Sequence, residues 1–290
     1  MSDPRADAVD APADAPAVTR AALAAGARPR RLGALYVAEH QLRAMRAYGW
    51  TIVVGGVGQP LVYLLGIGLG LAAFLDTSVA DGADGPVGYV EFVAPALLVT
   101  ASVGVAVDEF TYAVMNGFKW RRLYWAVNAS PVSPPQLAAG VVLAVAARML
   151  LTAAAYYALV LAFGAVEHPL RGALLPLVGV LTGLAFGLPL LAYSASLTDD
   201  RGQFALVQRF VFTPLFLFSG TFYPLATMPA ALQWVGWLSP VWHGAELGRA
   251  LSYGAPPGAW PAWAHLAVLL AQAGVGAWAA RRVFLRRLRS

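Results

Sequence analysis

Residues 137–163 read LAAGVVLAVAARMLLTAAAYYALVLAF and carry a single charged residue, Arg148. The stretch is longer than the ~20 residues that an α-helix needs to cross the hydrocarbon core of a bilayer. It lacks the strict alternation of a transmembrane β-strand. Comparable apolar blocks occupy residues 50–75, 89–107, 173–197, 204–222 and 260–280. The sequence therefore predicts an all-α polytopic membrane protein with six transmembrane helices.

The composition excludes a soluble protein. Hydrophobic residues make up 59% of the chain and charged residues 12%, with a mean hydropathy of +0.63, whereas soluble domains carry roughly 25% charged residues. The net charge of +5 comes from arginines that flank apolar blocks, so we interpret it as a topology signal and predict no nucleic-acid partner. The chain has no cysteine, which excludes a disulfide framework or a thiolate metal site.

Cations predict the orientation, because lysine and arginine are retained on the cytoplasmic side. With the N-terminus inside, 17 of the 20 lysines and arginines fall on the cytoplasmic side. The first outer loop then carries Asp76, Asp81 and Asp84 and no cation. We therefore predict that both termini are cytoplasmic.

The segments outside the six blocks divide the chain further. Residues 1–30 are rich in Ala, Asp and Pro, which favours a disordered cytoplasmic tail. Residues 31–48 have one apolar stripe and a basic side, a pattern typical of an interfacial helix. A transmembrane domain over residues 31–280 is then followed by a basic tail, residues 281–290.

A proline-rich apolar region, residues 223–257, precedes the last block. It is broken by Pro224, Pro229 and Pro240 and by the pair at 256–257, so a straight spanning helix is excluded. Two short helices, at about 228–238 and 241–251, that enter and leave the outer leaflet fit these breaks.

Several motifs, in this order, resemble the ABC-2 type transporter permeases. They are ASPVS at 129–133, FSGTFYPL at 218–225, LSPVWH at 238–243 and ELGR at 246–249. The resemblance is to the branch that contains the lipooligosaccharide (nodulation-factor) and daunorubicin-type exporter permeases. It implies a homodimer, or a heterodimer with a similar permease, in a prokaryotic cytoplasmic membrane. It also implies two ABC ATPase subunits, which bind ATP and Mg.

The function that the resemblance implies is export of an amphipathic substrate, such as a lipid-linked saccharide or a hydrophobic drug. Lys119, the only lysine, follows Phe118, so the chain lacks the Gly-Lys pair of a phosphate-binding loop. We expect no enzymatic activity and no cofactor on this chain. A gradient-driven secondary transporter of a hydrophobic compound is the alternative. Such a transporter would be expected to place carboxylates at span centres, and no predicted span centre holds an Asp or Glu. A rhomboid-like protease is disfavoured, because position 217 is leucine.

The resemblance implies that the ATPase contacts the chain before the first block and after the second. Such surfaces combine cations and aromatic residues, although a loop with an aromatic belt gives the same pattern. Asp108 and Glu109 could pair with these cations. The candidate coupling residues are Arg43, Arg46, Lys119, Trp120, Arg121, Arg122, Leu123 and Tyr124.

Candidate residues of the translocation path are Arg148, His243, Glu246 and Arg249. A central arginine costs roughly 2.5 to 3.5 kcal/mol to insert, so Arg148 either meets an anionic headgroup or substrate, or snorkels or bonds backbone carbonyls. Glu246 and Arg249 share a helix face and form a gate, a lipid contact or a structural pair. The other histidines are dispersed, which predicts no metal site.

Overall fold

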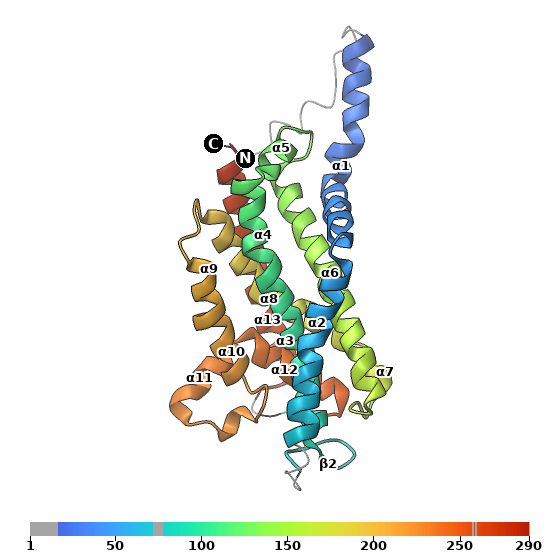
Figure 1. Cartoon of the computed structure of the whole chain (residues 1–290), viewed down its shortest axis with the longest axis vertical. Coiled ribbons are helices and arrows are strands. Elements are labelled where there is room, and N and C mark those ends of the chain that lie inside the picture. Colours follow the sequence, from blue (N-terminus) through green and yellow to red (C-terminus); the bar gives the residue numbers. More distant parts are fainter. Residues whose placement is uncertain (1–16, 72–77, 257, 259, 290) are drawn as a thin grey trace.

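The computed structural model describes residues 17–71, 78–256, 258 and 260–289. Within them the chain is a helical bundle with one two-stranded antiparallel hairpin (Figure 1). The elements are α1 (Ala17–Arg46), α2 (Gly49–Tyr63), the π-helix η2 (Leu64–Leu71), β1 (Ala80–Asp81), β2 (Pro86–Val87), α3 (Tyr89–Phe110), α4 (Tyr112–Met115), the π-helix η3 (Asn116–Trp120), α5 (Leu123–Asn128), α6 (Pro134–Ala162), α7 (Pro169–Gly172), α8 (Leu175–Ser196), α9 (Gln203–Leu206), the π-helix η4 (Val207–Phe212), α10 (Thr213–Phe218), the 3-10 helix η5 (Leu225–Thr227), α11 (Ala230–Leu238), α12 (Pro240–Ser252) and α13 (Ala262–Arg289).

Among the described residues, four helical segments are long and apolar enough to cross a membrane. They are Tyr89–Trp120, Pro134–Ala162, Pro169–Ser196 and Ala262–Arg289, and they match four of the six predicted spans. The predicted fifth span is a shorter apolar helix, Gln203–Phe218. It ends early because Gly220 turns the chain with a φ of +70°.

The predicted first span coincides with α2 and η2, which together run from Gly49 to Leu71. Its last predicted residues, 72–75, lie outside the described residues. Two short helices, α11 and α12, occupy the proline-rich region close to the predicted positions. Ser239 separates them, and its hydroxyl accepts a hydrogen bond from the Val241 amide at 3.1 Å and so caps α12.

The first helix differs from the prediction in two ways. Residues 17–30, predicted to be disordered, are helical, because alanine, the strongest helix former, dominates them. The helix kinks at Leu32, after Pro29. Residues 31–48 were predicted to form a separate helix, whereas α1 is one kinked helix from Ala17 to Arg46 that runs beside α6, along the long axis of the bundle (Figure 1). Its position along the membrane surface stays a prediction.

Small residues explain this position of α1. A Cβ atom on Gly140 of α6 would lie 2.5 Å from the Val37 side chain and 2.6 Å from the Ala34 carbonyl oxygen. The Gln136 side chain also donates a hydrogen bond of 2.5 Å to the Arg30 carbonyl. The glycine therefore permits a close helix contact that the amphipathic pattern of residues 31–48 does not reveal.

Glycines also set the centre of the bundle, where α8 packs against α3 and α6. Cβ atoms on Gly179, Gly183 and Gly187 would lie 2.7 to 2.9 Å from Ser102, Met149 and Phe110, respectively. The glycine face of α8 is thus buried inside the subunit. It allows the core helices to approach within a distance that any larger side chain would prevent.

A glycine of α13 makes a fifth close contact, which gives a testable prediction. A Cβ on Gly276 of α13 would lie 2.4 Å from Pro189 Cδ and 2.6 Å from the Pro189 backbone nitrogen, whereas a Cβ on Gly274 meets no described atom within 4 Å. We expect Gly276→Ala to destabilise the protein by about 1 to 3 kcal/mol through overpacking against α8. Gly274→Ala, two residues away, should be neutral or stabilising. Thermal denaturation in detergent measures both, and equal effects would contradict this packing.

The ends of the bundle separate the charges. Helix α5 and the end of α13 lie at one end, whereas β2 and α7 lie at the other (Figure 1). The loop cations at 119–122 and the basic tail therefore share one end, and Asp81 and Asp84 lie at the opposite one. The cations that the count assigns to the cytoplasm thus lie together in the fold, and the orientation itself stays a prediction.

Candidate functional site

A cavity of about 220 Å³ lies among α2, α3, α6 and the helical segment 203–218, which consists of α9, η4 and α10. Apolar side chains form much of its wall, including Tyr63, Leu97, Phe212 and Phe216. The polar part of the wall comes from Asp108, Arg148 and Gln208, together with two threonines. A cavity with one apolar and one charged region suits a molecule that has both kinds of surface.

Arg148 forms an ion pair with Glu109 across α6 and α3. The two side chains are only 12% and 18% exposed. The structure thus offsets the insertion cost of Arg148 by an intramembrane carboxylate, and not by snorkelling or by backbone carbonyls alone. Glu109 was predicted to pair with the loop cations or with the arginines of α1, and this prediction is wrong. Lys119 pairs with Asp199 instead, and Arg43 pairs with Glu39.

Other polar groups of Arg148 and Asp108 remain available in this cavity beside the ion pair. The Arg148 Nε is buried and has no hydrogen-bond partner among the described residues. Asp108, the neighbour of Glu109, is exposed and lines the same cavity. The cavity thus contains a guanidinium with an unused donor and a free carboxylate, which together can hold a polar group.

Toward the end of the bundle that holds α11 and α12, Arg249 is buried and each of its three guanidinium nitrogens donates a hydrogen bond. Its guanidinium donates hydrogen bonds to Glu246 at 2.7 Å, to the Gly220 carbonyl at 2.6 Å and to the Phe92 carbonyl at 3.3 Å. It also lies 3.8 Å from the centroid of the Phe92 ring. The Glu246–Arg249 pair that the spacing predicts is confirmed. Because Arg249 is only 2% exposed, it anchors α12 to α3 and to the loop after α10.

His243 pairs with a histidine from another helix. Its Nδ1 lies 2.9 Å from Nδ1 of His265 on α13, and its Nε2 lies 2.9 Å from the Trp237 carbonyl oxygen. A carbonyl only accepts, so Nε2 carries the proton and Nδ1 accepts from His265. Local sequence does not predict this pair, because 22 residues separate His265 from its partner.

These groups border a second cavity, of about 450 Å³, beside α11 and α12. Glu246, Arg249 and His265 line it, together with Asp81 and Gln233. Of the candidate path residues, three lie at this end of the bundle and Arg148 lies in the first cavity. The predicted path is therefore divided between two cavities, one charged at the centre and one beside the short helices.

The loop after α3 presents part of the predicted coupling surface. Trp120 is 56% exposed and stacks on Tyr112, and Arg121 and Arg122 are exposed. The prediction that Tyr124 lies on the coupling surface is wrong. Tyr124 is 2% exposed and packs edge to face on Phe118, with ring centroids 4.9 Å apart. Aromatic residues serve both surfaces and cores, and the sequence does not distinguish the two.

Of the other predicted coupling residues, some are exposed and some are half-buried or already paired. Leu123 is half-buried, and the Lys119 ammonium is engaged by Asp199 on the loop after α8. Arg43 and Arg46 are exposed in the last turns of α1. Three of the predicted coupling residues, Trp120, Arg121 and Arg122, are thus exposed side by side in the loop after α3, and we term them the basic patch.

Comparison with known proteins agrees with this architecture. Residues 35–253 match the protein family described as ABC-2 type transporter. Nodulation protein J of Rhizobium meliloti (strain 1021) is 26% identical over 204 residues, which cover 70% of this chain and 75% of that protein. Nodulation protein J of Sinorhizobium fredii (strain NBRC 101917 / NGR234) is 25% identical over 206 residues, covering 71% and 76%.

The family match extends over α2 to α12, including the proline-rich region whose motifs suggested the resemblance. Together with the apolar spanning helices, it establishes that this chain belongs to the ABC-2 type transporter family and is a membrane transport permease.

Proposed function

We propose that the chain is the transmembrane permease subunit of an ATP-driven exporter that moves an amphipathic substrate outward across the cytoplasmic membrane. The observation that carries this proposal is the cavity whose wall joins Asp108 and Arg148 to aromatic and aliphatic side chains. A saccharide or other polar group would lie against the charged region and a lipid or hydrophobic portion against Phe212 and Phe216. The motifs that resemble the lipooligosaccharide exporter permeases favour a lipid-linked saccharide; a hydrophobic drug is the other candidate substrate.

The arrangement of the elements supports an orientation of the chain in the membrane. The basic patch and the basic tail share one end of the bundle (Figure 1), which we assign to the cytoplasm. The short helices α11 and α12 lie toward the other end. We propose that they enter and leave the outer leaflet and shape the exit, where Arg249 and the His243–His265 pair hold them to α3 and α13.

Energy for transport would come from a partner that binds ATP and Mg. We propose that an ABC ATPase subunit contacts the basic patch, with Arg43 and Arg46 at its margin. Exposed tryptophan and arginine are the residue types most enriched at the centres of protein interfaces. Two such permease chains, identical or similar, would assemble in the membrane around the substrate path.

Reversing the charge of the basic patch tests this partnership. We expect Arg121→Glu/Arg122→Glu to reduce the ATPase that co-purifies from mildly solubilised native membranes by at least about tenfold, the equivalent of 1.4 kcal/mol. Arg171→Glu, an exposed arginine at the opposite end, is the matched control and should leave recovery unchanged. Mass spectrometry identifies the co-purified protein. Equal recovery from both variants would place the contact elsewhere, and absence of an ATPase from the wild-type protein would refute the exporter proposal.

One observation supports the alternative function, a gradient-driven secondary transporter. The carboxylate of Glu109 lies inside a candidate span. Such transporters use intramembrane carboxylates to carry protons. Vesicles separate the two functions: export driven by ATP in the presence of a proton uncoupler supports the exporter. Transport that the uncoupler abolishes and that needs no ATP supports the alternative.

A further inference from the structure

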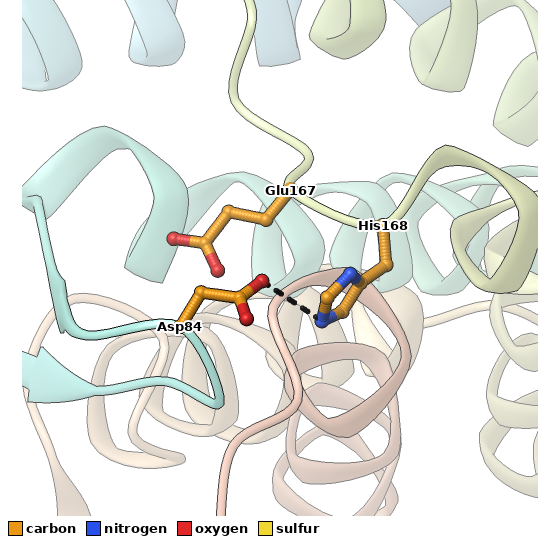
Figure 2. Close-up of side chains that lie close together, drawn as sticks. All are labelled: Asp84, Glu167 and His168. Carbon is orange, nitrogen blue, oxygen red and sulfur yellow. Dashed lines mark ion pairs between the residues drawn. The ribbon is translucent and has the colours of Figure 1, made fainter.

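Three side chains of metal-ligating type converge at the end of the bundle opposite the basic patch. Asp84 lies in the turn between β1 and β2, and Glu167 and His168 lie between α6 and α7 (Figure 2). One ligand atom from each residue lies within 4.8 Å of the other two. The hairpin and the loop are far apart in sequence, so only the fold brings these three groups together.

The imidazole of His168, whose side chain is 24% exposed, faces Asp84 as an ion pair but makes no hydrogen bond through Nε2 among the described residues (Figure 2). The Nε2 atom itself is buried. The nearest carboxylate oxygen, Oδ2 of Asp84, is 3.7 Å away, which is beyond hydrogen-bond distance. A buried polar atom without a partner costs free energy, and this one points toward two carboxylates (Figure 2).

The backbone holds the three residues in place. The His168 amide donates to the Ser252 carbonyl at 2.9 Å, and the Ala83 amide donates to the next carbonyl, that of Tyr253, at 3.0 Å. Both ligand-bearing segments are therefore fixed to consecutive residues at the end of α12. Gly254, with a φ of +66°, keeps this region open, because a Cβ there would lie 2.7 Å from Ala83 and 3.5 Å from the His168 Nε2. The site is thus preorganised by main-chain contacts and does not depend on the ligands themselves.

We propose that Asp84, Glu167 and His168 bind one Zn²⁺ ion. One imidazole nitrogen and two carboxylate oxygens are ligands that zinc accepts, at about 2.0 to 2.2 Å. Ca²⁺ and Mg²⁺ select all-oxygen sites, so the histidine favours zinc. Tetrahedral coordination requires ligand atoms roughly 3.3 Å apart. The side chain of Asp84 is 71% exposed, so it can rotate and bring its carboxylate closer to the other two ligands. Water would occupy the fourth position.

The ion would join the β1–β2 hairpin to the loop before α7. Both segments contact the end of α12, the helix that carries His243 and Arg249. Zinc would therefore clamp the surface next to the second cavity. Spacing along the chain predicts no metal site, because more than 80 residues separate Asp84 from His168.

Binding of zinc alone to the full-length protein tests the proposal. Protein purified in detergent without a polyhistidine tag and stripped with a chelator is titrated with ZnCl₂ by isothermal calorimetry, and bound metal is counted by elemental analysis. We expect one zinc ion per chain. Asp84→Asn and His168→Gln should each weaken binding by at least about tenfold, since even loss of an outer-shell partner costs 10- to 100-fold.

Two control variants make the test specific. Asp81→Asn removes a carboxylate of the same hairpin that lies outside the cluster, and His40→Gln removes an exposed histidine of α1; both should bind zinc as the wild type does. Zinc should also raise the thermal unfolding midpoint of the wild type and of both controls, but not of the two cluster variants. Unchanged zinc affinity in the cluster variants, a loss of affinity in the controls, or equal binding of Ca²⁺ and Zn²⁺ would overturn the proposal.

Discussion

Arg148→Leu is expected to destabilise the protein by about 3 to 5 kcal/mol, the largest effect that the structure predicts for a single substitution. The variant leaves the Glu109 carboxylate, which is 18% exposed, inside the bundle without its cation. Thermal or denaturant unfolding in detergent measures the loss. Asp108→Asn is the matched control, because Asp108 lines the same cavity but is exposed, and its stability should remain within about 0.5 kcal/mol of the wild type.

The double variant Arg148→Leu/Glu109→Leu separates structure from transport. Replacing a buried ion pair by apolar residues is often neutral or stabilising, so we expect stability to return to near that of the wild type. Transport into membrane vesicles should nevertheless be lost, because the proposed substrate site no longer holds a guanidinium. A double variant that is stable and transports normally would show that the pair is only structural. A single Arg148→Leu variant as stable as the wild type would contradict the ion pair itself.

Arg249→Leu is expected to destabilise the protein by about 2 to 4 kcal/mol. The substitution leaves the buried Gly220 carbonyl without its donor, which costs about 1 to 3 kcal/mol. It also removes a second donor to the Phe92 carbonyl, which lies within α3, and the contact of the guanidinium with the Phe92 ring. Glu246, the third partner, is 31% exposed and remains partly hydrated, so its loss of a partner adds little. The midpoint of thermal unfolding and the amount of protein in the membrane both report the effect.

Two further substitutions distinguish the anchor from a gate. Glu246→Gln keeps both bonds to carbonyl groups and should cost less than about 1 kcal/mol. Arg286→Ala, at an exposed arginine of α13, controls for the loss of a positive charge. If Arg249→Leu unfolds with the same midpoint as the wild type but fails to transport, Arg249 acts on the substrate and the structural role derived from its contacts is wrong.

The positions of the helices and of their breaks could be read from local sequence. The four candidate spans coincide with predicted apolar blocks, because burial of a helix in lipid depends on the summed hydropathy of neighbouring residues. Prolines likewise set the break between α11 and α12, since the backbone constraint of proline acts on its own turn. The Glu246–Arg249 pair was also predictable, because both residues lie on one face of one helix.

Contacts between helices were decided only by the tertiary structure. The pairs Glu109–Arg148 and His243–His265 and the convergence of Asp84 with His168 each join different elements. The burial of Tyr124 and the position of α1 beside α6 have the same origin. Hydropathy and propensity report how a segment meets its solvent, but which segments become neighbours depends on the packing of all helices at once. The sequence by itself therefore determined a helical membrane protein and most of its elements, whereas the packing of the bundle determined which charged and metal-ligating groups meet.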